Sequence, residues 1–438
     1  MTTENNCVDT VNVGELKVSK VSIITQFYPP DHAATGQLIE ELAKHLSQQN
    51  IEIQILTGQP AYGGEKQKIA PPREKQKSIA VRRSLTSRFL PKRLRGRAIN
   101  GLLFSFRSGL RLLKPSYRGD VILLTTEPPY LLVVGYFAKL MLNLPYVCLL
   151  YDLYPDVAVS LNVISEKHWL TRFWNWINAK IWKNAQGIIV LSSSMKNRIV
   201  AKYPEIADKI TVIPSWSDPN HVTPQPKVSN PFAIKHNLVK PFTVLYSGNM
   251  GRCHDMETIM ATAWELKDEP IQFVFIGGGA KYDQCYQTAI QEWELRNCLF
   301  LPFQPKKDLP NSLTACDLSL VTISEGMEGL VAPSKLYGIL AAGRAVAAVC
   351  EEHSYLCDLL SEAGCGQTFV NGDTKGLADY IRFLAKYPEK VETMGKAGRH
   401  YLETHFTPEV IAKQYAQVLF GSPFETSSSH QKKVEQLT

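Results

Sequence analysis

The sequence has no cysteine pattern that indicates disulfides or a metal site. Its nine cysteines form no Cys-x-x-Cys pair and lie mostly in apolar runs. We therefore expect reduced thiols in the core of a cytoplasmic protein. Residues 1–16 also lack the apolar stretch of a secretory signal. We expect this segment and the polar tail 421–438 to be flexible.

An uninterrupted apolar run of transmembrane length is missing as well. Residues 130–150 come nearest to one, but Lys139, Asn143 and Pro145 interrupt them. A proline is poorly tolerated where a spanning helix would have to continue. We expect a helix over 129–142, followed by a turn and a buried strand. The sequence thus favours a peripheral protein over a membrane-spanning one.

Acidic residues are absent from the stretch 75–119, which contains thirteen Lys or Arg. Subtracting these from the formal net charge of +7 leaves −6 for the rest of the chain, so the basic character is local. Residues 88–114 mix Leu, Ile and Phe with Arg at helical spacing, as in a basic amphipathic helix. Anionic lipid would attract such a face by about 1 kcal/mol per basic side chain. A solvated helix that covers a core is the alternative, whereas no nucleic-acid module accompanies the patch.

The chain of 438 residues is long enough for two domains of about 200 residues each. Short apolar strands alternate with helical stretches in two series, separated by the polar, proline-rich segment 217–231. Such strands are typical of parallel sheets buried on both faces, so we expect an α/β fold with two doubly wound domains facing across a cleft. The first series is 21–27, 51–58, 79–84, 120–126, 146–152, 187–192 and 210–215. The second is 242–249, 271–279, 298–303, 318–324, 345–350 and 366–370.

Ligands of such sheets bind beyond the carboxyl ends of the strands. One strand of the second series ends in the turn 246–255, which leads into a helix. Glycine there lets backbone N–H groups approach an anion, and the helix start adds about half a positive charge. Gly277, in the segment 276–280, belongs either to a similar turn or to a purely structural one. The residues of interest in the first turn are Ser247, Gly248, Asn249, Gly251, Arg252 and His254.

A third strand exit spans residues 324–346, with two carboxylates and a lysine before a helix that should end at Gly343. Pro333 suits the first turn of this helix, so the N–H groups of residues 330–332 are expected to face the cleft. Lys335 would add a full positive charge for a phosphate. A solvated surface lysine is the alternative.

The N-terminal half offers two more strand exits. Residues 27–37 pass through two prolines and Gly36, whose backbone can come close to a ligand. Residues 151–156 place Asp152 directly after a buried strand, where it can contact a sugar hydroxyl or polarise an acceptor. Asp156 suits either a similar contact or a helix N-cap.

Six segments in this order resemble glycosyltransferase family 4, the retaining enzymes of the GT-B fold: FYPPDHAATGQ, YDLYPD, VIPSWSD, YSGNMG, FVFIGGGA and VAPSKLYGILAAGRAV. More narrowly, the chain is similar to the bacterial transferases of capsule, exopolysaccharide and O-antigen assembly. The resemblance implies Rossmann-like domains for the acceptor and for the nucleotide-sugar donor. Their expected bounds are 17–216 for the acceptor domain, 217–240 for a linker, 241–405 for the donor domain and 406–420 for a closing helix that crosses back.

The resemblance also implies the substrates and the site. The donor is a UDP- or GDP-sugar, and the acceptor is a saccharide, often lipid-linked. Asp152 is expected beside the reacting sugar, Arg252 and Lys335 at the diphosphate, and Phe303 at the base. The other implied donor-binding residues are Gly36, Ser247, Gly248, Asn249, His254, Gly277, Glu325, Glu328, Leu330, Val331, Ala332 and Ser334.

Two departures from the family pattern concern charged residues. Many relatives carry an Arg and a Lys where Asn249 and His254 stand, which leaves Arg252 as the nearest strong cation. Relatives also commonly carry two glutamates, which fall on Leu330 and Gly338 here. The neighbouring Glu325 and Glu328 are the displaced candidates for the sugar contact.

The expected chemistry follows from the leaving group. Negative charge accumulates on the diphosphate as the glycosidic bond breaks, and fixed positive groups there are the largest plausible catalytic contribution. Arg252, Lys335 and two helix starts supply these groups, so we expect a hexosyltransferase with no metal or cofactor. It would serve polysaccharide synthesis at the inner face of the membrane. The alternatives are a nucleotide-sugar 2-epimerase of the same fold and a catalytically silent, nucleotide-binding membrane scaffold.

Overall fold

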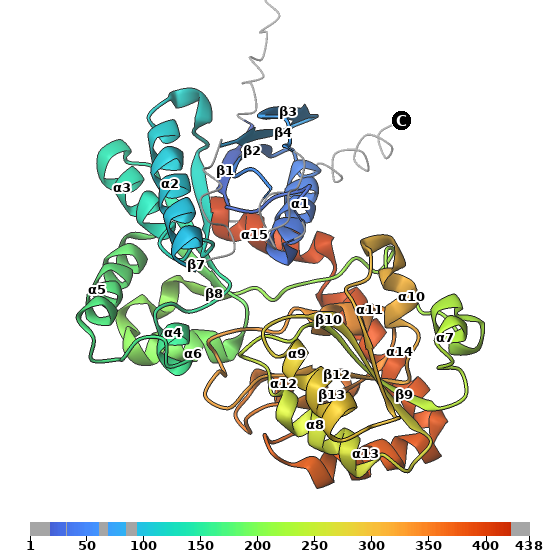
Figure 1. Cartoon of the computed structure of the whole chain (residues 1–438). Helices are drawn as coiled ribbons and strands as arrows, with labels where there is room; N and C mark the ends of the chain where they lie inside the picture. The colour runs from blue at the N-terminus through green and yellow to red at the C-terminus, as the bar shows by residue number, and fades with distance from the viewer. Residues whose placement is uncertain (1–17, 32, 61–68, 85–93, 422–438) are drawn as a thin grey trace, which may run out of the picture.

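The computed structural model describes residues 18–31, 33–60, 69–84 and 94–421. They form two α/β domains, drawn one above the other in Figure 1. The first sheet has eight strands in the order β3-β4-β2-β1-β5-β6-β7-β8, and the second has six in the order β11-β10-β9-β12-β13-β14. All neighbouring strands are parallel except β3 and β4. The predicted fold class of two doubly wound domains is confirmed.

The strands of the first domain occupy the positions that their apolar runs predict. Strands β5 and β6, in the middle of the sheet, are buried at every position. Only β3 was not predicted, because its four polar residues are all exposed at the sheet edge and leave no apolar pattern. The strands are β1 (Lys20–Ile24), β2 (Glu52–Thr57), β3 (Arg73–Gln76), β4 (Ile79–Arg83), β5 (Val121–Thr125), β6 (Tyr146–Leu150), β7 (Gly187–Val190) and β8 (Ile210–Val212).

All six strands predicted for the second domain are present. Strands β12 and β13 are fully buried, as expected for the middle of a parallel sheet covered on both faces. The strands are β9 (Phe242–Asn249), β10 (Ile271–Gly278), β11 (Cys298–Leu301), β12 (Leu318–Thr322), β13 (Ala345–Val349) and β14 (Gly366–Phe369).

Helices connect the strands, and polar side chains begin several of them. Ser192 accepts a hydrogen bond from the N–H of Met195, for example, and so starts α6. The helices of the first domain are α1 (Ala34–Ser47), α2 (Leu94–Leu112), α3 (Leu132–Leu142), α4 (Asp156–Ser160), α5 (Trp169–Asn184) and α6 (Ser193–Lys202). Those that follow are α7 (Pro231–Lys235), α8 (Met256–Glu265), α9 (Tyr282–Tyr286), α10 (Leu309–Leu313), α11 (Lys335–Ala341), α12 (Tyr355–Ala363), α13 (Thr374–Lys386), α14 (Pro388–His405) and α15 (Pro408–Phe420).

The two apolar or amphipathic stretches of the first domain form α2 and α3. Helix α3 ends at Asn143, which adopts a left-handed conformation with φ of 51°, and β6 follows, as predicted. Helix α2 covers most of the amphipathic helix predicted over 88–114. The first part of that prediction, residues 88–93, lies outside the described residues. Within the described ranges, no helix combines the length and apolar character needed to cross a membrane.

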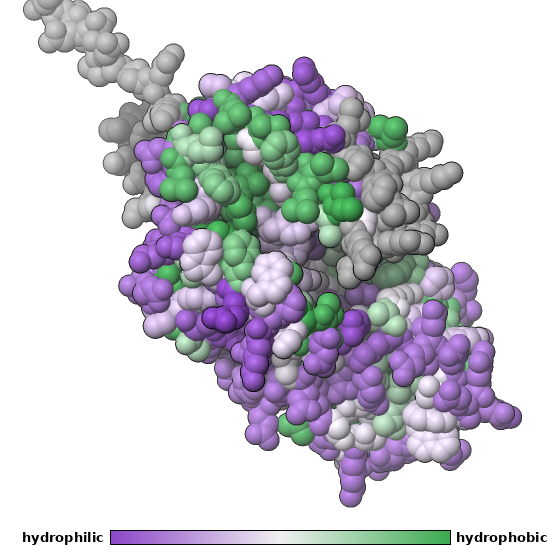
Figure 2. All heavy atoms as spheres, turned by 60° about the vertical axis from the view of Figure 1, so that its left-hand side comes forward, coloured by the Kyte–Doolittle hydropathy of each residue, from purple (hydrophilic) through white to green (hydrophobic). Residues whose placement is uncertain are grey.

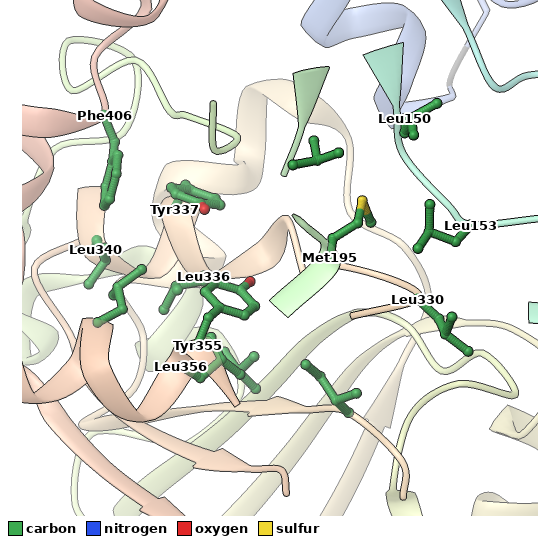
Figure 3. Close-up of a cluster of buried hydrophobic side chains, with 14 of the residues drawn as sticks. Leu150, Leu153, Met195, Leu330, Leu336, Tyr337, Leu340, Tyr355, Leu356 and Phe406 are labelled. Atoms are coloured by element: carbon green, nitrogen blue, oxygen red, sulfur yellow. The ribbon is translucent and has the colours of Figure 1, made fainter. Parts of the chain in front are cut away.

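Apolar packing joins the two domains. The last helix, α15, returns to the first domain, where Ile411, Tyr415 and Leu419 pack into the core formed with β1, β2 and α1 (Figure 1). A second cluster lies at the domain junction, where elements from both domains meet (Figure 3). Its members include Leu150, Leu153 and Met195 from the first domain and Leu330, Leu336, Tyr337 and Tyr355 from the second.

The cysteines of the described residues are all free. Six of these eight thiols are buried, and the other two, Cys253 and Cys357, are partly buried. The prediction of unpaired thiols, most of them in the core, is confirmed for these positions. Cys7 lies outside the described residues, as do the ends 1–16 and 422–438 that were expected to be flexible.

Candidate active site

The carboxyl ends of β9 and β10 are held together so closely that side chains are excluded. Gly277 pairs with Gly248 across the two strands, at a φ of 141°. A Cβ atom on Gly277 would lie 2.0 Å from the carbonyl oxygen of Gly248. A Cβ atom on Gly279, at a φ of 126°, would lie 2.3 Å from Oδ1 of Asn249. Glycine is therefore required here for strand packing, whatever binds beyond the strands.

The side chain of Lys335, the first residue of α11, reaches this turn. Its Nζ lies 4.0 Å from the centre of the Tyr246 ring, donates a hydrogen bond to the Tyr246 hydroxyl and lies 3.5 Å from the carbonyl oxygen of Asn249. A Cβ atom on Gly248 would lie 3.3 Å from Cε of Lys335. The structure thus brings together two strand exits that are far apart in sequence. It also excludes a freely solvated Lys335, because this side chain is held by the buried Tyr246.

Burial changes the protonation of the two basic groups at this turn. It lowers the pKa of Lys335 to about 7. It lowers the pKa of His254 to about 3, and the positive charges of Lys335 and Lys281 act in the same direction. His254 is therefore neutral, and its Nδ1 accepts a hydrogen bond of 2.9 Å from the N–H of Gly251. Only Lys335 of this pair can carry charge near neutral pH.

Arg252 and the first turn of α8 already have hydrogen-bond partners within the protein. The exposed Arg252 side chain donates to the carbonyl oxygen of Leu161 in the first domain, at 3.3 Å. The carboxylate of Asp255 already occupies the positive end of α8, where it accepts from the N–H of Thr258 at 2.9 Å. The expectation that this helix start is available to an anion is therefore wrong, because a capping carboxylate fills it.

The first domain contributes two partly buried carboxyl groups, those of Asp152 and Glu127. Burial raises the pKa of Asp152 to about 6. It raises the pKa of Glu127 to about 7, partly opposed by a 2.5 Å hydrogen bond from the Thr35 hydroxyl, and the nearby charges of Asp152 and Asp31 raise it further. Glu127 was not predicted as a site residue. Its position directly after the buried strand β5 is the sequence signal that could have identified it.

The loop before α11 packs against the first domain and buries one glutamate. Glu328 is 1% exposed, and neither of its carboxylate oxygens has a hydrogen-bond partner among the described residues. Arg198 donates to the backbone oxygen of Glu328 at 2.7 Å, and the N–H of Leu153 donates to the backbone oxygen of Leu330 at 3.0 Å. The N–H of Leu330 is bonded to Met327, at 3.0 Å, so it does not face the cleft as a free donor as expected.

The remaining predicted residues occupy varied surroundings. Phe303 is exposed, and its ring lies 3.1 Å from where a Cβ atom of Gly278 would be. Gly36 lies in the first turn of α1, packed against the backbone of Phe27. Ser247, Val331 and Ala332 are half-buried, whereas Glu325 and Ser334 are exposed. In the described parts of the chain, no group of three or more His, Cys, Asp or Glu side chains is arranged to hold a metal ion.

Comparison with known proteins identifies both domains. A family model described as "Glycosyl transferase 4-like domain" matches residues 34–216. A second, described as "Glycosyl transferases group 1", matches residues 230–401. The chain belongs to the glycosyltransferase family in which these two domains are combined. The predicted family is confirmed, and the two matches fall on the two α/β domains.

Named relatives match this glycosyltransferase in sequence, and solved structures match it in fold. It is 25% identical to the glycosyltransferase WbjE of Pseudomonas aeruginosa over 91% of this chain and 97% of WbjE. It is 31% identical to a protein of Escherichia coli (strain K12) named "Putative colanic acid biosynthesis glycosyl transferase WcaI", over 54% of this chain and 58% of WcaI. Among solved structures, Anabaena Alr3699/HepE in complex with UDP and glucose shares the fold, with a TM-score of 0.68 and 16% identity over 92% of this chain and 99% of HepE. This structural similarity to HepE agrees with the GT-B fold predicted for this glycosyltransferase.

Proposed function

We propose that the protein is a retaining, metal-independent hexosyltransferase of cell-surface polysaccharide biosynthesis. It takes a sugar from a nucleotide-diphosphate donor and transfers it to a lipid-linked saccharide. The named role of WcaI in colanic acid biosynthesis supports the pathway, and the UDP and glucose in the HepE structure support the donor class. The observation that carries the proposal is the contact of Lys335 with the glycine turn at Gly248.

The proposed role of Lys335 is to stabilise the departing diphosphate. The lysine is held in place by Tyr246, so little reorganisation is needed when negative charge develops. In the free site its charge is disfavoured by burial, and a diphosphate beside it would restore that charge. The exposed Phe303 would stack on the base. Arg252 serves as a second cation if it leaves Leu161 when the donor binds.

We further propose that carboxyl groups from both domains contact the sugar. Asp152 would lie beside the reacting sugar, with Glu127 behind it on the acceptor side. Glu328 has carboxylate oxygens without hydrogen-bond donors among the described residues, and sugar hydroxyls are suitable donors. Glu328 is therefore our choice for the sugar contact that two glutamates make in relatives, in preference to the exposed Glu325.

Membrane attachment is the remaining part of the proposal, and an apolar surface supports it. Figure 2 shows hydrophobic side chains gathered over the upper domain, where α2 and α3 lie, while the lower domain is mostly hydrophilic. Large apolar side chains follow one stripe along each of three neighbouring helices, α2, α3 and α5. Exposed faces of this size mark interaction surfaces. The members are Ile99, Leu102, Phe106, Leu110 and Leu113 on α2 and its end, Phe137, Leu140 and Met141 on α3, and Trp169, Leu170, Phe173 and Trp176 on α5.

We call this surface the three-helix apolar face. Arg107 and Arg111 of the acid-free stretch are on α2 itself and supply positive charge beside this face, and Lys180 lies 6.0 Å from the Trp176 ring on α5. Tryptophan and basic side chains together are typical of proteins that lie on a membrane surface. We propose that the protein binds peripherally to the inner face of the membrane, through this face together with residues 75–119.

Transfer can be tested with radiolabelled UDP- and GDP-sugars and a bacterial membrane extract. We expect the label to enter the lipid fraction only when the extract is present. The variant Lys335→Met should slow transfer about 100-fold, while the exposed Lys240→Met serves as a matched control with unchanged rate. Epimerised donor without an acceptor would indicate an epimerase. Nucleotide binding without any turnover would indicate a silent scaffold, and either result would refute the proposal.

A further inference from the structure

Five arginines line one pocket of the first domain, apart from the residues assigned to the donor and the reacting sugar. The pocket has a volume of about 510 Å³ and lies among β3, β4 and α2. A pocket of this size accommodates a small ligand. The pocket residues that matter here are Arg73 of β3, Arg82 and Arg83 of β4, Ser84, and Arg107 and Arg111 of α2.

Two buried side chains in this arginine pocket have polar atoms without hydrogen-bond partners among the described residues. Arg83 is 2% exposed, and its Nη2 donates to the carbonyl oxygen of Pro29 at 2.7 Å, but its Nε and Nη1 have no partner among the described residues. The hydroxyl of Ser84, which is 1% exposed, also has none. Leaving such a group unpaired costs about 1–3 kcal/mol, so a ligand that accepts these hydrogen bonds would be favoured.

The charges of the arginine pocket are not balanced. Among the described residues, the one ion pair made by its arginines joins Arg83 to Glu74, with Nη2 3.1 Å from Oε1. Burial lowers the pKa of Arg111, and the positive charges of Arg107, Arg82 and Arg73 lower it further, so these guanidinium groups repel one another. An anion would relieve that repulsion. Guanidinium groups suit phosphate in particular, because they donate two parallel hydrogen bonds to it.

The surroundings of the arginine pocket indicate where the phosphate comes from. Leu110 lines the pocket and is also part of the three-helix apolar face, so an anion in the pocket would lie next to an apolar surface. On the other side, Arg83 donates to the carbonyl oxygen of Pro29, in the loop before α1. Thr35 in the first turn of α1 in turn donates to Glu127. A ligand with a phosphate next to a hydrocarbon chain matches both neighbours.

We propose that the arginine pocket binds the phosphate or diphosphate group of a lipid. The lipid-linked acceptor and an anionic membrane lipid share this chemistry. The choice of a lipid rests on the proposed function, whereas the anion site itself rests on the pocket residues alone.

The test compares two pairs of substitutions that remove the same charge. The pocket pair is Arg73→Gln with Arg107→Gln, two exposed side chains, and the control pair is Lys75→Gln with Lys114→Gln, also exposed and in the same basic stretch. Binding of geranylgeranyl diphosphate is measured by calorimetry with saturating UDP, which occupies the donor site. Flotation with phosphatidylcholine vesicles, with or without phosphatidylglycerol, is measured on the same proteins.

We expect the pocket pair to weaken binding of geranylgeranyl diphosphate about tenfold or more, and the control pair less than about threefold. A pocket-specific loss confined to phosphatidylglycerol vesicles would support the same anion site and assign it to membrane headgroups. Equal losses in both pairs, or no loss in either, would overturn the proposal, because attraction would then depend on overall charge. Diphosphate-lipid binding by a protein that fails to bind UDP would contradict the proposed transferase instead, and leave the pocket standing.

Discussion

The buried position of Lys335 makes its protonation depend on the donor. Its pKa in the folded protein is about 7, compared with an ordinary value of 10.5. The difference corresponds to about 5 kcal/mol against the charged form, and the remaining partial exposure of the side chain reduces that to a few kcal/mol. A bound diphosphate would reverse much of this penalty through its own negative charge. We therefore predict that nucleotide binding is coupled to proton uptake at this lysine.

The size of the uptake follows from the pKa. At pH 8 a group with a pKa of about 7 is about one-tenth protonated. Binding of UDP should therefore be accompanied by the uptake of close to 0.9 proton per site by Lys335. Isothermal titration calorimetry in two buffers with different ionisation enthalpies measures this number. At pH 8 UDP is itself fully ionised, so its own titration adds nothing to the count.

Two variants decide whether Lys335 is the responsible group. Lys335→Met should abolish the proton uptake and weaken UDP binding. Glu127→Gln should preserve the uptake, although Glu127 also has a pKa of about 7. Uptake near zero in the wild-type protein, or uptake that persists in Lys335→Met, would refute the assignment of Lys335 to the diphosphate.

Three further predictions concern stability and surface binding. Lysine 335 binds fewer protons when folded than when unfolded between pH 7 and 10.5, so wild-type stability should rise with pH there, and Lys335→Met should unfold at a higher temperature at pH 7; an equal or lower melting temperature would contradict this. Glu127 binds more protons in the folded than in the unfolded protein between pH 4.5 and 7, so stability falls as the pH rises through this range. In urea unfolding, Glu127→Gln should raise the free energy of unfolding by up to about 3 kcal/mol at pH 8 and by less at pH 5, and an equal increase at both pH values would contradict the raised pKa of Glu127. Phe106→Ser with Trp176→Ser should reduce vesicle flotation several-fold without lowering the melting temperature, since both side chains are exposed; unchanged flotation would exclude the three-helix apolar face as the membrane contact.

Apolar patterning was sufficient to predict most of the fold. Every predicted strand is present, and the central strands β5, β6, β12 and β13 are buried at every position and so read as continuous apolar runs. Strand β3 has no buried face, and its four residues are polar and exposed at the sheet edge, so its sequence carried no such signal. The turn at Asn143 was also predictable from the sequence, because it depends on one residue, which adopts the left-handed conformation.

The candidate site was less predictable because it depends on contacts between distant segments. Sequence marked Lys335 and Gly248 separately, but their contact depends on how α11 packs against β12 and β13. The capping of α8 by Asp255 was missed, although an Asp before a helix is a recognisable cap. Glu127 stands at the exit of β5, which is a signal that the sequence offered, but its contact with Thr35 becomes visible only in three dimensions.

The position of a bound nucleotide tests the central claim most directly. A crystal structure of the protein with UDP should place diphosphate oxygens in hydrogen-bond contact with Nζ of Lys335 and beside the backbone of Gly248. A diphosphate bound away from both residues would contradict the proposed donor site.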